Sequence, residues 1–198
     1  MPIVDIETFE TLLKSTISSE TLCDDYLLDD EVWLLCRSPG ADPSITYASI
    51  KSFIREQFPL EKIDAHIVGS AKLGFSAAPL KWGNLFDDDN SDIDIAITSE
   101  NLFDVAYREI SHQYLNGKIR YFPFMGRCLM GSNIPIGENV TGTSEFLIEL
   151  LKKSSALKRK FGERFSIHNE INFRIYRSMT EVRLYHAHGF TKLRKQVT

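Results

Sequence analysis

The chain has 198 residues, of which 43% are hydrophobic and 25% are charged, and its net charge is −4. These values are ordinary for one globular domain, and no apolar run approaches the roughly 18 residues of a membrane span. We therefore predict a single domain over 1–198 that does not enter a membrane. The three cysteines form no Cys-x-x-Cys pair, and the first residues lack the pattern of a secretory signal, which favours a cytoplasmic protein with reduced thiols.

Charge is distributed unevenly along the chain. Residues 1–150 hold 11 Lys/Arg and 24 Asp/Glu, a net charge of −13, whereas residues 151–198 hold 12 and 3, a net charge of +9. A basic segment on an acidic body indicates a phosphate, nucleic-acid or acidic protein partner. The alternative is that the two parts pack together and neutralise one another.

The first 60 or so residues are predicted to be mainly helical and to pack around the core. Apolar residues share a helical face in 5–16 and in a segment from 44 or 46 to 58, and a cap at Ser18-Ser19-Glu20 predicts a helix to Leu28. Residues 29–36 fit either a helix or a strand, and the Pro- and Gly-containing stretch 38–43 predicts a break.

Two short strands follow, and each carries a polar motif. The apolar run 63–68 ends at Gly69-Ser70, where a turn without a Cβ allows backbone amides to surround phosphate oxygens. In 91–97, Asp92 and Asp94 point to one face of a strand and the isoleucines to the other. Two parallel carboxylates suit Mg²⁺, which usually binds one or two carboxylates together with substrate phosphates. The alternative is an edge strand whose polar face meets water.

The segment between the two strands contains lysines of interest. Residues 74–90 form a long loop, of the kind that is usually functional or mobile. Lys72, just before this loop, and Lys81, within it, are candidates to contact substrate phosphates. The alternative is that both are ordinary surface lysines. The acidic run 87–89 predicts a solvated turn.

Helices and one further strand complete the predicted order. We expect a helix over 101–115, a loop or lid over 126–143, a helix from 143 or 144 to about 160, a strand over 164–175 and a basic helix over about 178–197. His186 and His188 are two residues apart, so a helix does not present them to one metal, and we interpret them as ordinary helix residues.

The order of strand, Gly-Ser turn, connecting segment and Asp-x-Asp strand resembles the nucleotidyltransferase superfamily typified by DNA polymerase β. The resemblance covers roughly 63–97, in HIVGSAKLGFS and NSDIDIAI, and is carried by Gly69, Ser70, Gly74, Ser91, Asp92 and Asp94. It implies an α+β (α/β-like) fold: a small mixed sheet that carries both motifs, flanked by helices. It also implies Mg²⁺ or Mn²⁺ at Asp92 and Asp94, and a nucleoside triphosphate such as ATP against Gly69 and Ser70.

That family usually has a third acidic residue on a later strand, and the corresponding position here is Asn172. The side-chain amide oxygen of an asparagine can ligate a metal, but the amide cannot accept a proton as a general base. Glu170, two residues earlier on the same face, is the candidate to replace the missing acid; the alternative is an exposed residue paired with Arg174 or a lysine. Arg174 and Arg177 are candidates to contact triphosphate oxygens.

The sequence therefore favours a nucleotidyltransferase that transfers a nucleoside monophosphate from a triphosphate to a protein, an RNA end or a small molecule. The resemblance suggests a bacterial defence or toxin–antitoxin setting, with a protein partner. The alternative is a non-catalytic nucleotide-binding or protein-interaction module of the same fold. In that case Asn172 stands at the position of a catalytic acid that the protein has lost. An RNA-binding protein that uses the basic C-terminal quarter is a third interpretation.

Overall fold

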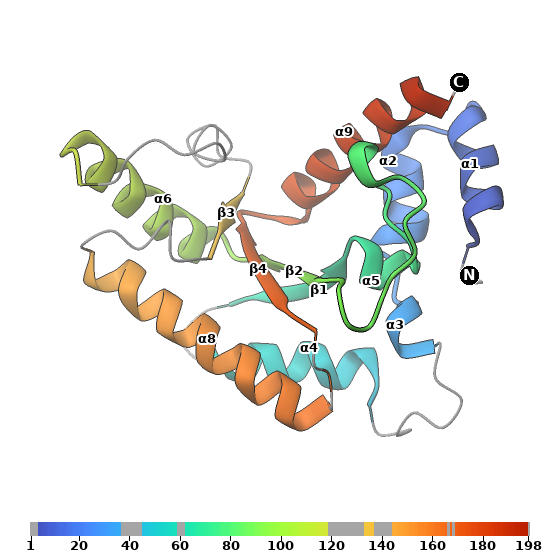
Figure 1. The fold of residues 1–198 in the computed structure, drawn as a ribbon. Coiled ribbons are helices and arrows are strands. Elements are labelled where there is room, and N and C mark those ends of the chain that lie inside the picture. Colours follow the sequence, from blue (N-terminus) through green and yellow to red (C-terminus); the bar gives the residue numbers. More distant parts are fainter. Residues whose placement is uncertain are drawn as a thin grey trace.

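A small mixed sheet lies at the centre of the molecule, with helices on both sides (Figure 1). The computed structural model describes residues 4–36, 45–58, 62–118, 133–136, 144–165, 167 and 169–197. The strands, in the spatial order β1-β2-β4-β3, are β1 (Asp64–Val68), β2 (Ile93–Thr98), β3 (Ile134–Pro135) and β4 (Ile171–Tyr176). β2 and β4 are parallel, whereas β1 and β3 are antiparallel to their neighbours. The predicted α+β architecture with a small mixed sheet is confirmed.

The N-terminal helices begin at side-chain caps that are visible in the sequence. The Asp5 carboxylate accepts a hydrogen bond from the Thr8 amide at 2.7 Å, and Thr46 forms a capping box with Ser49. The elements are α1 (Ile6–Lys14), α2 (Ser19–Leu22), the π-helical turn η1 (Cys23–Leu27), α3 (Trp33–Cys36) and α4 (Tyr47–Glu56). The predicted break at 38–43 lies outside the described residues, as does most of the predicted loop or lid at 126–143.

The later elements differ from the prediction at one boundary. They are α5 (Ser70–Leu73), the 3-10 turn η2 (Pro79–Lys81), α6 (Glu100–Leu115), α8 (Glu145–Phe165) and α9 (Met179–Val197). The strand predicted over 164–175 begins only at Ile171, because α8 extends to Phe165. Phe161 and Phe165, four residues apart, both pack on Phe53 of α4, with ring centroids 6.2 and 5.4 Å away, and this burial favours the helix.

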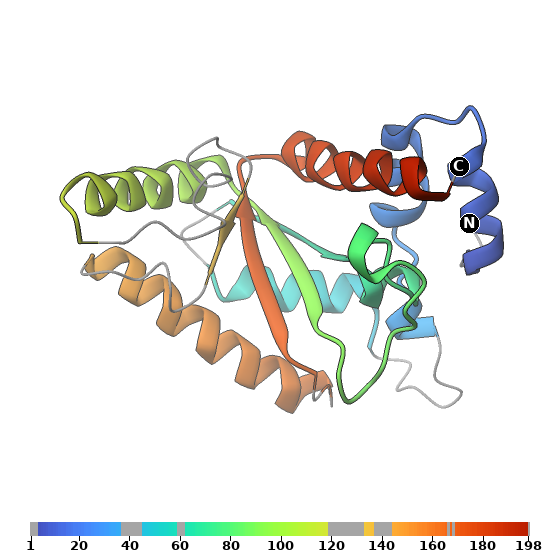
Figure 2. The same cartoon turned by 45° about the horizontal axis from the view of Figure 1, so that its top comes forward.

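The two faces of the sheet bury different sets of side chains. Isoleucines of β1, β2 and β4 pack against α4, α6 and α8, while Val68, Ala96 and Tyr176 pack against α1, α2 and α9. Figure 2 shows α9 running towards the N-terminal helices, so the two ends of the chain lie close together. Since strand side chains alternate, Asp94 and Asn172 lie on the same face as Ala96, beside α9.

Ion pairs join the basic C-terminal segment to the acidic body. Arg183 Nε of α9 lies 2.6 Å from Asp24 Oδ1, and Arg177 Nη2 lies 2.7 Å from Asp104 Oδ1 of α6. These contacts support the interpretation that the two oppositely charged parts partly neutralise one another. None of the helices in the described ranges is long and apolar enough to cross a membrane.

Candidate functional site

The sheet register brings the polar residues of β2 and β4 to one position. Asp94 of β2 is paired with Val68 of β1 on one side and with Asn172 of β4 on the other. The Asn172 amide nitrogen donates a hydrogen bond to Asp92 Oδ2 at 3.1 Å, and Arg174 Nε lies 4.0 Å from Asp94 Oδ1. Two carboxylates, an amide and a guanidinium therefore share one end of one sheet face.

The turn after β1 approaches this group closely. Gly69 has φ +71° and ψ −148°, a conformation that residues other than glycine rarely adopt. A Cβ at this position would lie 3.2 Å from Asp94 Oδ2. The absence of a side chain at Gly69 therefore allows the Gly69-Ser70 turn to lie directly against the Asp94 carboxylate.

Asp94 is the electrostatically unusual member of the group. Burial raises the pKa of its carboxyl above the ordinary value, and the nearby charge of Asp92 adds to this rise. The positive charges of Arg174 and Lys81 act in the opposite direction without cancelling it. Additional positive charge at this position would therefore stabilise the ionised form of Asp94.

Arg174 is supported from α9 by two residues that the sequence interpretation did not assign to the site. Its guanidinium carbon lies 6.0 Å from the centre of the Tyr185 ring, and the His186 ring meets Tyr185 edge-on at 5.1 Å. Burial, with a smaller effect of the Arg174 charge, lowers the pKa of His186 to about 3, so its imidazole is neutral. His186 Nε2 has no hydrogen-bond partner within the described part of the chain.

The signal that could have located His186 is helical spacing. Val182, His186 and Phe190 recur every four residues, and the two apolar members are fully buried. His188, the other histidine of this helix, is exposed on another side of α9 and does not share this spacing.

Lys72 is not brought to this group. Its side chain is fully buried, and its ammonium donates to the Asp29 carboxylate, to the backbone oxygen of Asp29 at 2.8 Å and to that of Glu31. Burial lowers the pKa of Lys72, and Asp29 opposes this effect. The structure thus differs from both sequence interpretations, a phosphate contact and a solvated lysine, because α5 directs the side chain towards the segment before α3.

Glu170 and Arg177 also make contacts away from the Asp92–Asp94 group. The Glu170 backbone oxygen accepts from the Ile93 amide at 2.8 Å, but its carboxylate is 68% exposed and lies 3.6 Å from Lys158 of α8. This is the alternative arrangement considered for Glu170, an exposed residue paired with a lysine. Arg177 directly follows β4 and pairs with Asp104, so it lies at the opposite end of this strand from Asn172.

The donor set fits a hard divalent cation that also binds a substrate. The two Asp carboxylates and the Asn172 amide oxygen are the kinds of ligand that Mg²⁺ and Mn²⁺ prefer. Within the ranges that the structure describes, no three His, Cys, Asp or Glu side chains gather to hold a metal ion. A cation here would therefore rely on substrate phosphates and water for the rest of its coordination shell.

A scan against protein-family models, a search of curated proteins and a search of solved structures each found no match. Any functional assignment therefore depends on the residues of this group and on their arrangement.

Proposed function

We propose that this protein is a metal-dependent nucleotidyltransferase. The observation that supports the proposal most is the convergence of three elements: the Gly69 turn lies against Asp94, Asp94 is paired with Asn172, and Asn172 donates to Asp92. The sequence order of the same residues resembles the superfamily typified by DNA polymerase β. The substrate would be a nucleoside triphosphate, and the product a nucleoside monophosphate joined to an acceptor hydroxyl.

Asp92 and Asp94, with the Asn172 amide oxygen, would hold Mg²⁺ or Mn²⁺. Such a cation neutralises the triphosphate and polarises its α-phosphate when it is bound. Arg174 is oriented by Asp94 and by the Tyr185 ring, and its guanidinium would contact phosphate oxygens. Gly69 and Ser70 would allow the triphosphate to approach the backbone closely. Lys72 has no part in this scheme, because its ammonium is already bound by Asp29 and two backbone oxygens.

Activation of the acceptor hydroxyl is assigned to Glu170. Asn172 cannot accept the proton, whereas the Glu170 carboxylate can. Glu170 would first have to leave Lys158, and an exposed ion pair of this kind contributes at most about 1 kcal/mol. Glu170 is therefore able to turn towards an acceptor bound near Asp92.

A second candidate function is a nucleotide-binding module without catalysis. The observation that favours it is that the described residues bring no third carboxylate to the group: Asn172 is paired with Asp94, and Glu170 is bound to Lys158. Such a module would bind a nucleotide and its cation through Asp92 and Asp94 and would transfer nothing.

Incubation with each labelled nucleoside triphosphate, Mg²⁺ or Mn²⁺ and a cell extract separates the two functions. The proposal predicts a labelled product. It also predicts that Glu170→Gln lowers the yield of this product by about 10²- to 10⁴-fold while nucleotide binding survives. Lys158→Met is the matched control, since it releases Glu170 and leaves the carboxylate in place. An inactive wild type that gains activity on Asn172→Asp would overturn the enzyme assignment in favour of the non-catalytic module.

A further inference from the structure

A short turn of acidic residues, 87–91, leads directly into Asp92 and β2. The turn is closed by its own hydrogen bonds: the Asp87 amide donates to Ser91 Oγ at 2.9 Å, and the Ser91 amide donates to the Asp87 backbone oxygen at 2.9 Å. The Asp87 carboxylate also accepts from two backbone amides inside the turn. The turn is therefore an internally bonded unit, and its position relative to β4 decides where Asp92 begins.

Asn169, two residues before β4, connects this turn to the strand that carries Asn172. Its side-chain nitrogen Nδ2 lies 2.7 Å from the backbone oxygen of Asp88, 2.9 Å from that of Ser91 and 3.4 Å from that of Asp87. Three carbonyl oxygens around one atom require a donor, because an amide oxygen in the same place would meet only acceptors. The Asn169 side chain is therefore held with its NH₂ group against the turn.

Asp92 depends on hydrogen bonds for its direction, because its side chain is exposed rather than packed in the core. Asn172 Nδ2 donates to its carboxylate oxygen Oδ2 at 3.1 Å, and Asn169 binds the oxygen of the peptide group that joins Ser91 to Asp92. The first contact aims the carboxylate, and the second fixes the backbone from which the carboxylate projects. Asp94 differs, because it lies within β2 and is paired with a strand on each side.

We propose that Asn169 is a positioning residue for the Asp92 carboxylate, which binds the cation in the proposed function. The inference rests on that function and adds to it a side chain that touches neither the cation nor the nucleotide. Partners that orient a metal ligand typically contribute about 10- to 100-fold to metal affinity. Because Asn169 binds backbone oxygens, its role does not depend on the carboxylates of the acidic turn.

The first test needs neither cation nor nucleotide. In NMR spectra of the full chain, the side-chain amide signals of Asn172 report its hydrogen bond to Asp92, and Asp92→Ala gives their positions when that bond is absent. We expect Asn169→Ala to move these signals towards the Asp92→Ala positions and to speed the exchange of their protons with water. Asn90→Ala is the matched control and should leave them in place, because the Asn90 amide donates to Asp87 within the turn, at 3.2 Å.

The second test measures the consequence for binding, by calorimetric titration with Mn²⁺ and, in turn, ATP, GTP, CTP and UTP. We expect Asn169→Ala to weaken the cation-dependent binding about 10- to 100-fold and Asn90→Ala to leave it unchanged. Asn169→Gln keeps both N–H donors on a longer side chain, and its affinity should lie between those of Asn169→Ala and the wild type. Affinities are compared at a temperature at which every variant is folded, so that lost stability does not contribute.

Unmoved Asn172 signals in Asn169→Ala would overturn the inference. A folded Asn169→Ala variant that binds cation and nucleotide as tightly as the wild type would overturn it as well. A wild type that binds no nucleotide with the cation would contradict the proposed function instead. The Asn172 signals would then still decide whether Asn169 positions Asp92, so the two failures are distinguishable.

Discussion

At the scale of single residues, Gly69 determines how closely the first turn approaches Asp94. Its φ of +71° and the 3.2 Å distance from a hypothetical Cβ to Asp94 Oδ2 both oppose any side chain. We expect Gly69→Ala to lower the free energy of unfolding by about 1–3 kcal/mol, as measured by urea denaturation. Gly83→Ala is the matched control, because Gly83 has φ +76° but no atom lies within 4 Å of its hypothetical Cβ. Equal losses in the two variants would show that the contact with Asp94 has no energetic effect.

Asp94 should make stability depend on pH in a predictable direction. Its raised pKa means that the folded state prefers the protonated carboxyl, so this contribution to stability is complete below the ordinary value of about 4. The contribution is lost as pH rises through the raised pKa. In chelator-containing buffer, we therefore expect Asp94→Asn to melt at a higher temperature than the wild type at pH 7.

The difference in melting temperature between Asp94→Asn and the wild type should shrink as pH falls below about 4, where the wild-type carboxyl is also neutral. Asp92→Asn, at an exposed position on the same face, is the control and should change the melting temperature less. An Asp94→Asn variant that is less stable than the wild type at pH 7 would contradict the electrostatic account of this site.

At the scale of elements, Lys72 connects α5 to the segment before α3. Its buried ammonium depends on the Asp29 carboxylate and on two backbone oxygens. We expect Asp29→Ala to lower the free energy of unfolding by about 1–3 kcal/mol, because it leaves a buried charge with fewer partners. Asp30→Ala removes the neighbouring carboxylate, which is 88% exposed and pairs with Lys51, and should cost at most about 1 kcal/mol. A larger loss for Asp30→Ala would contradict the role given to Lys72.

Local patterns were sufficient to predict most helices. α1, α4 and α6 each combine an apolar face with a side-chain cap, and both are properties of neighbouring residues in the sequence. The two motif strands were likewise predicted locally, the first from an apolar run that ends at the Gly-Ser turn and the second from its alternation. The position of Asn172 beside Asp94 follows from the parallel pairing of β4 with β2, which the structure adds.

The features that local patterns could not specify are contacts between distant segments. The direction of Lys72 is decided by Asp29, 43 residues earlier, and the start of β4 is decided by the packing of Phe165 on Phe53. Glu170 is held by Lys158 of α8, which neither its strand periodicity nor its own neighbours could specify. Such pairings depend on how the elements pack, and a single sequence does not encode them in its local spacing.

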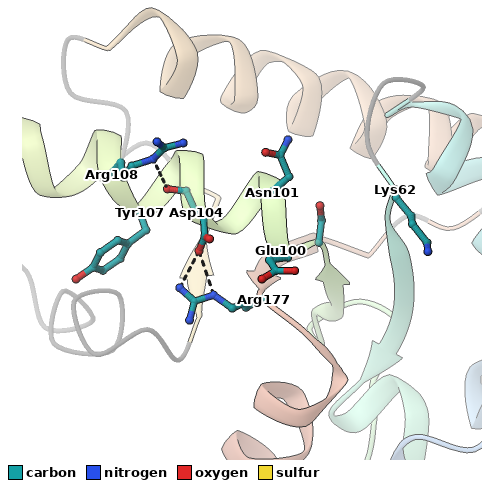
Figure 3. A pocket seen from close by; sticks show the side chains of 8 residues that line it. Lys62, Glu100, Asn101, Asp104, Tyr107, Arg108 and Arg177 are labelled. Atoms are coloured by element: carbon teal, nitrogen blue, oxygen red, sulfur yellow. Dashed lines mark hydrogen bonds and ion pairs between the residues drawn. The ribbon is translucent and has the colours of Figure 1, made fainter.

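At the scale of the whole molecule, β2 carries a distinct group at each of its ends. Asp92 and Asp94 lie at its start, and a pocket lined by Ser99, Asp104 and Arg177 lies beyond its carboxyl end (Figure 3). Because the two groups share no residue, substitutions at one should add independently to substitutions at the other. The internal ion pairs Arg183–Asp24 and Arg177–Asp104 also reduce the charge contrast between the two parts of the chain.

The central claim is that Asp92 and Asp94 bind a divalent cation together with a nucleotide. Calorimetric titration of each nucleoside triphosphate, with Mg²⁺ or Mn²⁺ and then with a chelator, tests it most directly. We predict binding that requires the cation, that disappears in a folded Asp92→Ala/Asp94→Ala variant, and that persists in Asp88→Ala/Asp89→Ala, which removes two exposed carboxylates of the preceding turn. Unchanged affinity in the folded Asp92→Ala/Asp94→Ala variant would contradict the claim.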